Sequence, residues 1–286
     1  MYNQNMNRSL PNTSFSMGYV TLNVRDIDVM KDFYQHTLLL DKIFENDTTV
    51  QFGKNGTLLL ELNATPDRQP ASLRDAGLYH FAILYSSGND LANTVKHILI
   101  HRPDIFAGSA DHLVSEAFYF TDPEGNGIEL YVDRNYKTWV WNNGSIAMST
   151  NYLNPNDFIL RNSVPDSNES GISIGHIHLK VGDLNRAKKF YVNCIGFQIT
   201  AEFPGALFLS FDRYHHHIGL NIWESDGAGR RTNSSGLASF EFVITDQVLT
   251  EKIINSIKAN NVVYEEDRNK ISFSDPWNNQ IMISKK

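Results

Sequence analysis

The stretch Gly175-His-Ile-His-Leu-Lys-Val-Gly-Asp183 has a near copy earlier in the chain, Gly18-Tyr-Val-Thr-Leu-Asn-Val-Arg-Asp26. In both stretches apolar residues alternate with other residues, which is typical of a β-strand with one buried face. Each ends at an aspartate suited to cap a helix, and a helical pattern with an aromatic pair follows, Phe33-Tyr34 in one copy and Phe190-Tyr191 in the other. The chain therefore repeats a unit made of a strand, a helix and several strands.

A second pair of copies lies between these two. Gly77-Leu-Tyr-His-Phe-Ala-Ile83 matches Gly236-Leu-Ala-Ser-Phe-Glu-Phe242, and each stretch leads into a helical pattern. Both units then close with a strand, a turn and a strand, with Phe120-Thr-Asp-Pro123 matching Phe273-Ser-Asp-Pro276. The sequence thus contains four copies of one βαβββ module.

These repeats predict an α+β fold in which four βαβββ modules form two domains, each with cupped mixed sheets. One module alone would expose the apolar face of its sheet, so we expect the modules to pair. The expected division is a first domain at 1–135 with modules at about 17–63 and 77–134, a connecting segment at 136–172 with one short element, and a second domain at 173–286 with modules at about 174–224 and 236–284.

The composition narrows the classes of protein. Hydrophobic residues make up 41% of the 286 residues and charged residues 20%, which is typical of a globular chain. The net charge of −7 and the lack of a long basic run argue against a nucleic-acid partner. No apolar run approaches the ~20 residues of a membrane span, and Met1–Ser16 has no apolar signal core. With a single cysteine, Cys194, a cytoplasmic location is the expectation.

Glu129 is an unusual residue in its predicted strand. It lies among apolar residues, after a turn that contains Asp122, Pro123 and two glycines. A carboxylate in such a strand costs free energy unless it is paired or binds a metal; the alternative is an edge strand on which Glu129 faces water. The matching position of the fourth module is Met282, so the fold itself does not require an acid there.

The four modules also differ at the start of their first strands, where they carry Tyr19, His80, His176 and Ser239. The second and third modules together thus offer two histidines and Glu129. Two histidines and one carboxylate with open positions form the facial triad of mononuclear Fe(II) enzymes, and the same ligand types suit Mn(II) and Zn(II). We therefore predict a metal site formed by His80, Glu129 and His176, whose ligand types do not by themselves determine which metal binds.

Strand alternation does not choose between His176 and His178, because residues two apart share a face. The repeat register aligns His176 with His80, so His178 is expected to line the pocket. Since the ligands come from the second and third modules, we expect these two modules to form the metal cup. The first and fourth modules would then form a cup without metal.

The repeats and the stretches 175–183 and 122–129 resemble the vicinal oxygen chelate superfamily, which implies that the modules form two glyoxalase/dioxygenase-type domains. Within it the chain is similar to extradiol ring-cleavage dioxygenases, in particular the catechol 2,3-dioxygenases of bacilli, over residues 17–284. The resemblance implies that His80, Glu129 and His176 are the metal ligands. It also implies a difference, since well-known two-domain members take their ligands from the third and fourth modules.

The same resemblance suggests further site residues. The run Tyr214–Leu220 matches a strand with a catalytic histidine, and His216 is the best match by register, acting as general base and acid. Tyr119 matches a tyrosine whose hydroxyl approaches the bound substrate. Asp111 and His112 resemble an Asp-His pair near the site.

The strand of the third module is expected to continue through Trp223, which is a candidate pocket residue. If alternation holds there, His215 and His217 face away from His216. The nearest acid to this strand is Glu224, at its end.

The resemblance implies an Fe(II)-dependent enzyme that cleaves the ring of a catechol-type aromatic diol with O2, and it leaves room for a homo-oligomer. One alternative is a glyoxalase-like isomerase or lyase, which resembles a four-ligand site with a carboxylate from each module. Another is a resistance protein that binds a small molecule without catalysis. The lack of an acid inside the third module's strand favours three ligands and oxygen chemistry.

Overall fold

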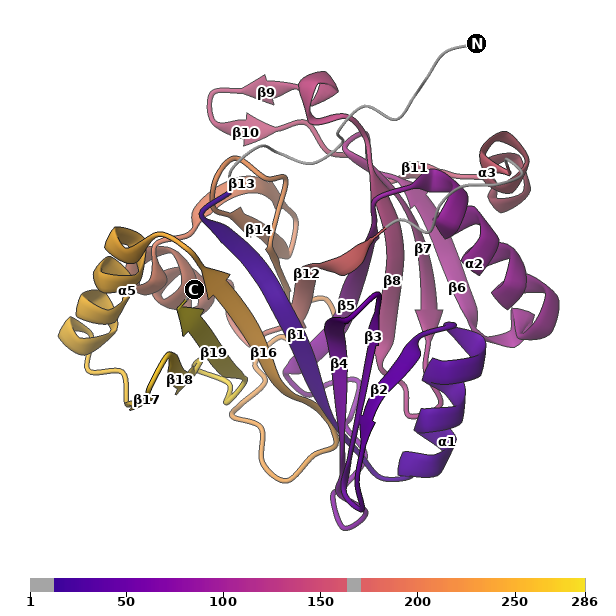
Figure 1. The fold of residues 1–286 in the computed structure, drawn as a ribbon. Helices are drawn as coiled ribbons and strands as arrows, with labels where there is room; N and C mark the ends of the chain where they lie inside the picture. The colour runs from indigo at the N-terminus through magenta and orange to yellow at the C-terminus, as the bar shows by residue number, and fades with distance from the viewer. Residues whose placement is uncertain (1–12, 164–170, 286) are drawn as a thin grey trace.

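The computed structural model describes residues 13–163 and 171–285, and four modules of similar construction account for most of them (Figure 1). The first contains β1 (Phe15–Val24), α1 (Ile27–Asp32) with the π-helical turn η1 (Phe33–Thr37), β2 (Asp41–Glu45), β3 (Thr49–Lys54) and β4 (Thr57–Ala64). The second contains β5 (Gly77–Tyr85), α2 (Gly88–His101), the short helix η2 (Pro103–Ile105), β6 (Phe106–Asp111), β7 (Ser115–Thr121) and β8 (Gly127–Asp133). The third contains β12 (Ile172–Lys180), α4 (Leu184–Ala187) with η4 (Lys188–Ile195), β13 (Gln198–Phe203), β14 (Ala206–Ser210) and β15 (Ile218–Asn221). The fourth contains β16 (Gly236–Ile244), α5 (Gln247–Ala259), β17 (Tyr264–Asp267), β18 (Lys270–Ser274) and β19 (Gln280–Lys285).

Two large mixed sheets organise these modules. An eight-stranded sheet has the order β17-β18-β19-β16-β1-β4-β3-β2, and a nine-stranded sheet has the order β11-β6-β7-β8-β5-β12-β15-β14-β13. At their centres β1 pairs antiparallel with β16, and β5 pairs antiparallel with β12. Sheet pairing thus joins the first module to the fourth and the second to the third. The α+β class and the cupped mixed sheets expected from the sequence are confirmed.

The connecting segment contains more structure than the one short element expected. It has η3 (Tyr136–Thr138), the hairpin of β9 (Trp141–Asn142) and β10 (Ser145–Ile146), β11 (Asn151–Tyr152) and α3 (Pro155–Asn162). Asn154 caps α3 by accepting hydrogen bonds from two backbone amides of its first turn. Strand β11 pairs with β6 and lengthens the nine-stranded sheet, so the segment is part of the second module's surface rather than a free linker. Figure 1 places this hairpin and α3 at the upper edge of the molecule.

Alternation along the central strands of the nine-stranded sheet separates two kinds of side chain. On β8, Ile128 and Leu130 join the main apolar core, whereas Glu129 lies on the other face with Tyr131 and Asp133. The apolar core takes members from both sheets, including Val20, Phe52, Phe81, Ile177 and Phe242. The sheet is therefore buried on both sides, with an apolar face toward the core and a polar face inside its cup.

A repeated hydrogen-bond motif ties modules that are consecutive in the chain. Tyr34 on η1 donates its hydroxyl proton to Asp122 at 2.8 Å, and Tyr191 on η4 donates to Asp275 at 2.9 Å. Each aspartate also accepts bonds from its own turn, Asp122 from the backbone and side-chain nitrogens of Asn126, both at 2.8 Å. Burial raises the pKa of Asp122 to about 6 against these stabilising bonds. The repeated aromatic pair and the repeated Asp-Pro turn are thus the two halves of one contact between modules.

We expect Tyr34→Phe to lower the free energy of unfolding by about 1–3 kcal/mol, because it removes a buried hydrogen-bond donor from Asp122. Urea denaturation of the folded chain measures this value. Tyr191→Phe should give a similar loss through Asp275, whereas Tyr152→Phe, on a largely exposed ring, should change little. An unchanged unfolding free energy in both buried variants would show that the motif does not contribute to stability.

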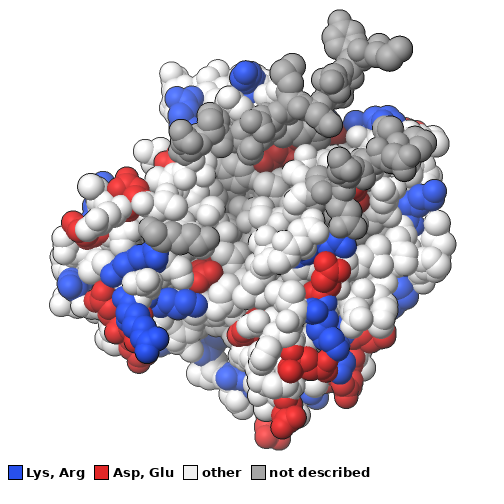
Figure 2. All heavy atoms as spheres, in the orientation of Figure 1, with Lys and Arg blue, Asp and Glu red and all other residues white. Residues whose placement is uncertain are grey.

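The surface is mixed in charge. On the face shown in Figure 2, basic and acidic side chains are interspersed around the lower edges, and the visible middle is largely uncharged. Among the described residues, no helix is both long and apolar enough to cross a membrane.

Candidate metal centre

His80, Glu129 and His176 come from three adjacent strands at the middle of the nine-stranded sheet. His80 lies on β5, Glu129 on β8 and His176 on β12, with β5 between the other two. Ala82 of β5 is the register partner of both Glu129 and His176. Its small side chain leaves the space between the two outer strands open, and His80 enters this space from two residues earlier on the same face.

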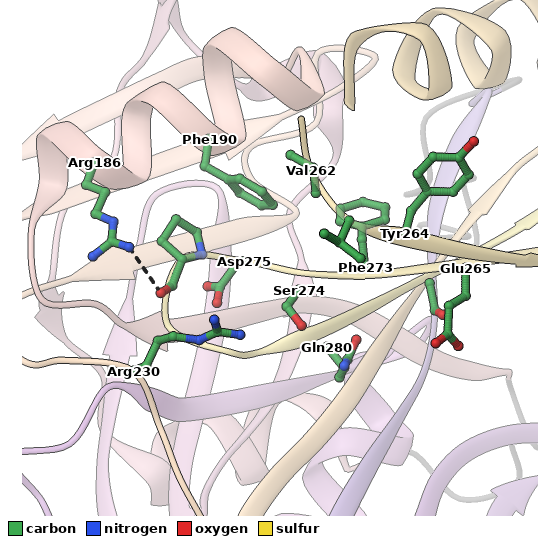
Figure 3. A pocket seen from close by; sticks show the side chains of 13 residues that line it. Arg186, Phe190, Arg230, Val262, Tyr264, Glu265, Phe273, Ser274, Asp275 and Gln280 are labelled. Atoms are coloured by element: carbon green, nitrogen blue, oxygen red, sulfur yellow. Dashed lines mark hydrogen bonds between the residues drawn. The ribbon is translucent and has the colours of Figure 1, made fainter. Parts of the chain in front are cut away.

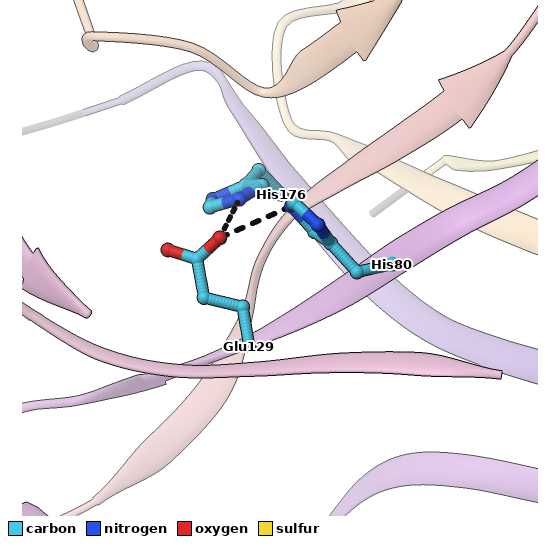
Figure 4. Close-up of side chains that lie close together, drawn as sticks. All are labelled: His80, Glu129 and His176. Atoms are coloured by element: carbon cyan, nitrogen blue, oxygen red, sulfur yellow. Dashed lines mark hydrogen bonds and ion pairs between the residues drawn. The ribbon is translucent and has the colours of Figure 1, made fainter. Parts of the chain in front are cut away.

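The three side chains converge on one point (Figure 4). Nε2 of His80 lies 3.0 Å from Oε2 of Glu129, and Nε2 of His176 lies 3.2 Å from the same oxygen. One potential ligand atom from each residue lies within 4.8 Å of the other two. The exposed fractions of the residues are 7%, 3% and 1%, respectively, so bulk water does not solvate this cluster.

The protonation states of the cluster suit a divalent cation. Burial by itself would raise the pKa of the Glu129 carboxyl. The nearby imidazoles of His176 and His80 have a larger, opposite effect, so the pKa lies well below its usual range. Burial lowers the pKa of His176 to about 4, although Glu129 acts in the opposite direction. A neutral imidazole and an ionised carboxylate are the forms that bind metals.

An unsatisfied atom points to the same ion. Nε2 of His80 is buried and, among the described residues, makes no hydrogen bond of good geometry, although Oε2 of Glu129 is near. A buried polar atom without a partner costs about 1–3 kcal/mol. A cation between the three groups would remove that cost, so these residues fit a metal ion with two nitrogen ligands and one oxygen ligand.

Tyr119 and His112 form a pair beside the carboxylate. Tyr119 on β7 is the direct register partner of Glu129. Nδ1 of His112 lies 2.7 Å from the carbonyl oxygen of Ser149 and must donate to it, so in a neutral ring Nε2 accepts the Tyr119 hydroxyl proton at 2.6 Å. Partial burial and the charge of Glu129 raise the pKa of Tyr119 well above its ordinary value, which keeps the phenol protonated.

Asp111 lies away from this pair despite its sequence position beside His112. Its carboxylate forms an ion pair with Arg134 at 2.7 Å and caps the backbone of Leu113. Within the described part of the chain it makes no contact with His80, Glu129 or His176.

His178 lies on the same face of β12 as His176 but has a different hydrogen-bond partner. Asn221 donates to its Nε2 at 3.0 Å, which occupies one of the two potential ligand nitrogens of the ring. Its ring lies 5.0 Å from that of His80 and 5.7 Å from that of Trp223. Gly219 makes this position possible, because a Cβ there would come within 2.7 Å of the His178 ring. Trp223 is half-exposed and lies after β15 rather than within it, so it borders the cluster on its solvent side.

His216 lies close to the three converging residues. Its ring centroid is 4.1 Å from that of His176 and 4.9 Å from that of Phe208. Burial and the charges of the neighbouring imidazoles, His176 first, hold the pKa of His216 well below its ordinary value, so the neutral base predominates at pH 7.

The expectation that His215 faces away from His216 was wrong. Nδ1 of His215 lies 2.8 Å from Nδ1 of His216, whereas Nδ1 of His217 lies 3.0 Å from Oγ of Ser210. Residues 211–217 form a loop, and β15 begins only at Ile218, so the two-residue alternation of a strand does not apply. The sequence argument also missed Asp133, whose position on the same face as Glu129 follows from alternation along β8.

Arg186, Phe190, Arg230, Tyr264 and Asp275 are among the residues that line a surface cavity elsewhere in the molecule (Figure 3). The cavity has a volume of about 580 Å³ and lies between the third and fourth modules. It contains none of the candidate site residues. The converging histidines and Glu129 are therefore a separate, buried cluster within the other sheet.

Comparisons with known proteins agree with this architecture. Residues 16–130 and 173–283 match the sequence profile of the Glyoxalase/Bleomycin resistance protein/Dioxygenase superfamily. A catechol-2,3-dioxygenase of Bacillus subtilis (strain 168) is 35% identical over 275 residues, covering 91% of this chain and 93% of the relative. Among solved structures, a putative dioxygenase from Bacillus subtilis has a TM-score of 0.61 at 13% identity, covering 94% of this chain and 84% of that one. Glyoxalase I from Zea mays has a TM-score of 0.56 at 16% identity, with 95% and 92% covered, and these two structures show a shared fold.

Proposed function

The chain belongs to the Glyoxalase/Bleomycin resistance protein/Dioxygenase superfamily, and from this membership we propose that it is an Fe(II)-dependent extradiol dioxygenase acting on a catechol-type diol. The observation that carries the proposal is the buried convergence of His80, Glu129 and His176. The catechol-2,3-dioxygenase relative supports the reaction class, since it aligns along nearly the whole chain. Fe(II) is the proposed ion, with Mn(II) and Zn(II) as the alternatives that this ligand set also accommodates.

The bound ion would supply coordination positions for the two oxygens of a catecholate and for O2. Because the chain offers three ligands, positions for these small molecules would remain open on such an ion. In this proposal His80, Glu129 and His176 fix the ion, and their low exposure keeps competing water away from the reacting atoms.

His216 and Tyr119 would handle the protons and the developing charge. A diol must lose a proton to chelate, and the neutral imidazole of His216, next to His176, can accept it and return it later. The protonated hydroxyl of Tyr119, opposite Glu129, can donate a hydrogen bond to a substrate oxygen that gains negative charge. His112 holds that hydroxyl in place before substrate arrives.

The aromatic side chains on the solvent side suit a planar ring. The ring centroids of Tyr79 and Trp223 lie 5.6 Å apart, and both rings contact that of His178. We propose that Trp223 and His178 contact the substrate's ring, because offset and edge-to-face aromatic contacts are favourable.

A metal-dependent isomerase with four protein ligands is less well supported. The strand β15 contains no carboxylate, and its last residue, Asn221, is engaged with His178. Glu224 lies in the exposed turn after β15. A binding protein without catalysis would not need the paired Tyr119 and His112 beside its metal.

Anaerobic loading with Fe(II), followed by catechol and O2, tests the proposal. We expect a yellow ring-opened product that forms only with both the metal and O2 present. If fully Fe(II)-loaded protein opens neither catechol nor its alkyl- and halogen-substituted forms, the proposed reaction is wrong.

We expect Tyr119→Phe to lower kcat at least about tenfold, because it removes one donor to the developing oxyanion. Fe(II) content should stay at the level of the unsubstituted protein, which steady-state kinetics with parallel iron analysis would establish. Tyr79→Phe is the control, since its ring contacts His80 while its hydroxyl has no hydrogen-bond partner in the described parts of the chain. Equal rates for Tyr119→Phe and the unsubstituted protein would exclude a role for this hydroxyl.

A further inference from the structure

A chain of buried polar side chains lies behind His216. Asp133, at the end of β8, places Oδ1 2.8 Å from Nε2 of His215. The other nitrogen of His215, Nδ1, lies 2.8 Å from Nδ1 of His216. Asp133 and His215 are 5% and 0% exposed, so water does not compete for these bonds. The proposed catalytic histidine is therefore linked through a second imidazole to a buried carboxylate.

The direction of each hydrogen bond follows from the carboxylate. Ionised Asp133 can only accept, so Nε2 of His215 carries the proton that is donated to it. In the neutral ring Nδ1 of His215 is an acceptor, and Nδ1 of His216 must then carry the proton of their shared bond.

We propose that Asp133 and His215 are positioning residues that fix His216 as its Nδ1–H tautomer and so leave the Nε2 lone pair free to accept a proton. Nε2 of His216 has no hydrogen-bond partner among the described residues. The orientation of His216 is thus held at one nitrogen, and the other is available for chemistry. The catalytic part of this inference rests on the proposed dioxygenase function, whereas the tautomer does not.

Aromatic side chains pack around the hydrogen-bonded residues Asp133, His215 and His216. The ring of His215 lies 4.1 Å from that of Tyr214 at an interplanar angle of 34°, and 5.2 Å from that of Trp139. The Tyr214 hydroxyl donates to Oδ2 of Asp133 at 3.0 Å, which occupies the second carboxylate oxygen. Trp139 belongs to the connecting segment, and its indole nitrogen donates to the carbonyl of Val114. The segment that connects the second and third modules therefore provides one wall around His215.

A pair of variants with similar shapes separates the hydrogen bond from packing. In His215→Asn the amide oxygen can take the place of Nδ1 as an acceptor for His216, whereas His215→Leu has nearly the same shape and no acceptor. Neither side chain reaches the Nε2 position that donates to Asp133, so the loss of that bond is common to both variants. With Fe(II)-loaded enzyme and catechol, we expect kcat of the leucine variant to be at least about tenfold below that of the asparagine variant, with similar KM and iron content. Equal kcat values in the two variants would overturn the positioning role.

Nitrogen-15 NMR of histidine-labelled, Zn(II)-loaded protein tests the tautomer without requiring dioxygenase activity. We expect a protonated Nδ1 and an unprotonated Nε2 on His216 in the unsubstituted protein and in His215→Asn, and a shift toward protonated Nε2 in His215→Leu. A protonated Nε2 on His216 in the unsubstituted protein would overturn the inference, even if the enzyme cleaves catechol. The expected tautomer in a protein without ring-cleaving activity would instead support the positioning role of Asp133 and His215 and contradict the proposed reaction.

Discussion

Glu129→Gln is expected to weaken Fe(II) binding by about 100-fold or more, because the amide is a poorer ligand than the carboxylate and removes the negative charge that offsets the cation. The same charge lies 3.0 Å and 3.2 Å from the two histidine nitrogens that would share the ion. Anaerobic titration of the metal-free protein against a competing chelator measures the affinity directly.

Thermal unfolding gives a second readout for this variant. A metal that binds only the folded chain adds about 2.7 kcal/mol of stability at a free concentration 100 times its dissociation constant. Fe(II) or Zn(II) should therefore raise the Tm of the unsubstituted protein and leave that of Glu129→Gln nearly unchanged. Glu241→Gln is the matched control, since Glu241 is also a buried acid but lies in the eight-stranded sheet. Equal metal affinity in Glu129→Gln and the unsubstituted protein would remove Glu129 from the ligand set.

His216→Asn is expected to lower kcat by about 100-fold or more while the metal remains bound, because it removes the base that accepts the diol proton. The contact between His216 and His176 is a ring contact rather than a hydrogen bond, so Fe(II) affinity should change by no more than a few fold. Steady-state rates with catechol, normalised to iron content, measure the effect.

His217→Asn provides the comparison within the same loop. His217 turns toward Ser210 and packs on Phe15, away from the candidate ligands, so its loss should affect stability more than kcat per bound iron. If His216→Asn and His217→Asn have the same kcat, His216 is not the base.

Much of the fold could be predicted because the sequence repeats. Alternation in the strands at 18–26 and 175–183 identified the modules, and the mismatch between Glu129 and Met282 at equivalent positions singled out an acid that the fold did not need. Glu129, His80 and His176 each lie within a strand, where the position along the chain constrains the face of a side chain. The structure brings these three together with His216, Tyr119, His112 and His178.

The parts that could not be predicted depend on loops and on long-range contacts. His215 lies in a loop where alternation fails, and its partner Asp133 is 82 residues away in the chain. The resemblance placed Asp111 near the site together with His112, but the carboxylate of Asp111 forms an ion pair with Arg134 instead. The connecting segment has no clear periodicity, so its hairpin and the position of Trp139 beside His215 emerge only when the sheets are assembled.

The central claim is that this chain uses Fe(II) and O2 to open a catechol ring at the His80, Glu129 and His176 site. The most direct measurement is O2 consumption by anaerobically Fe(II)-loaded protein mixed with a limiting amount of catechol, with the ring-opened product quantified in the same sample. We expect one O2 to be consumed for each ring opened, and no consumption by Glu129→Gln at the same iron concentration. Ring opening without O2 uptake, or undiminished turnover by Glu129→Gln, would contradict the central claim.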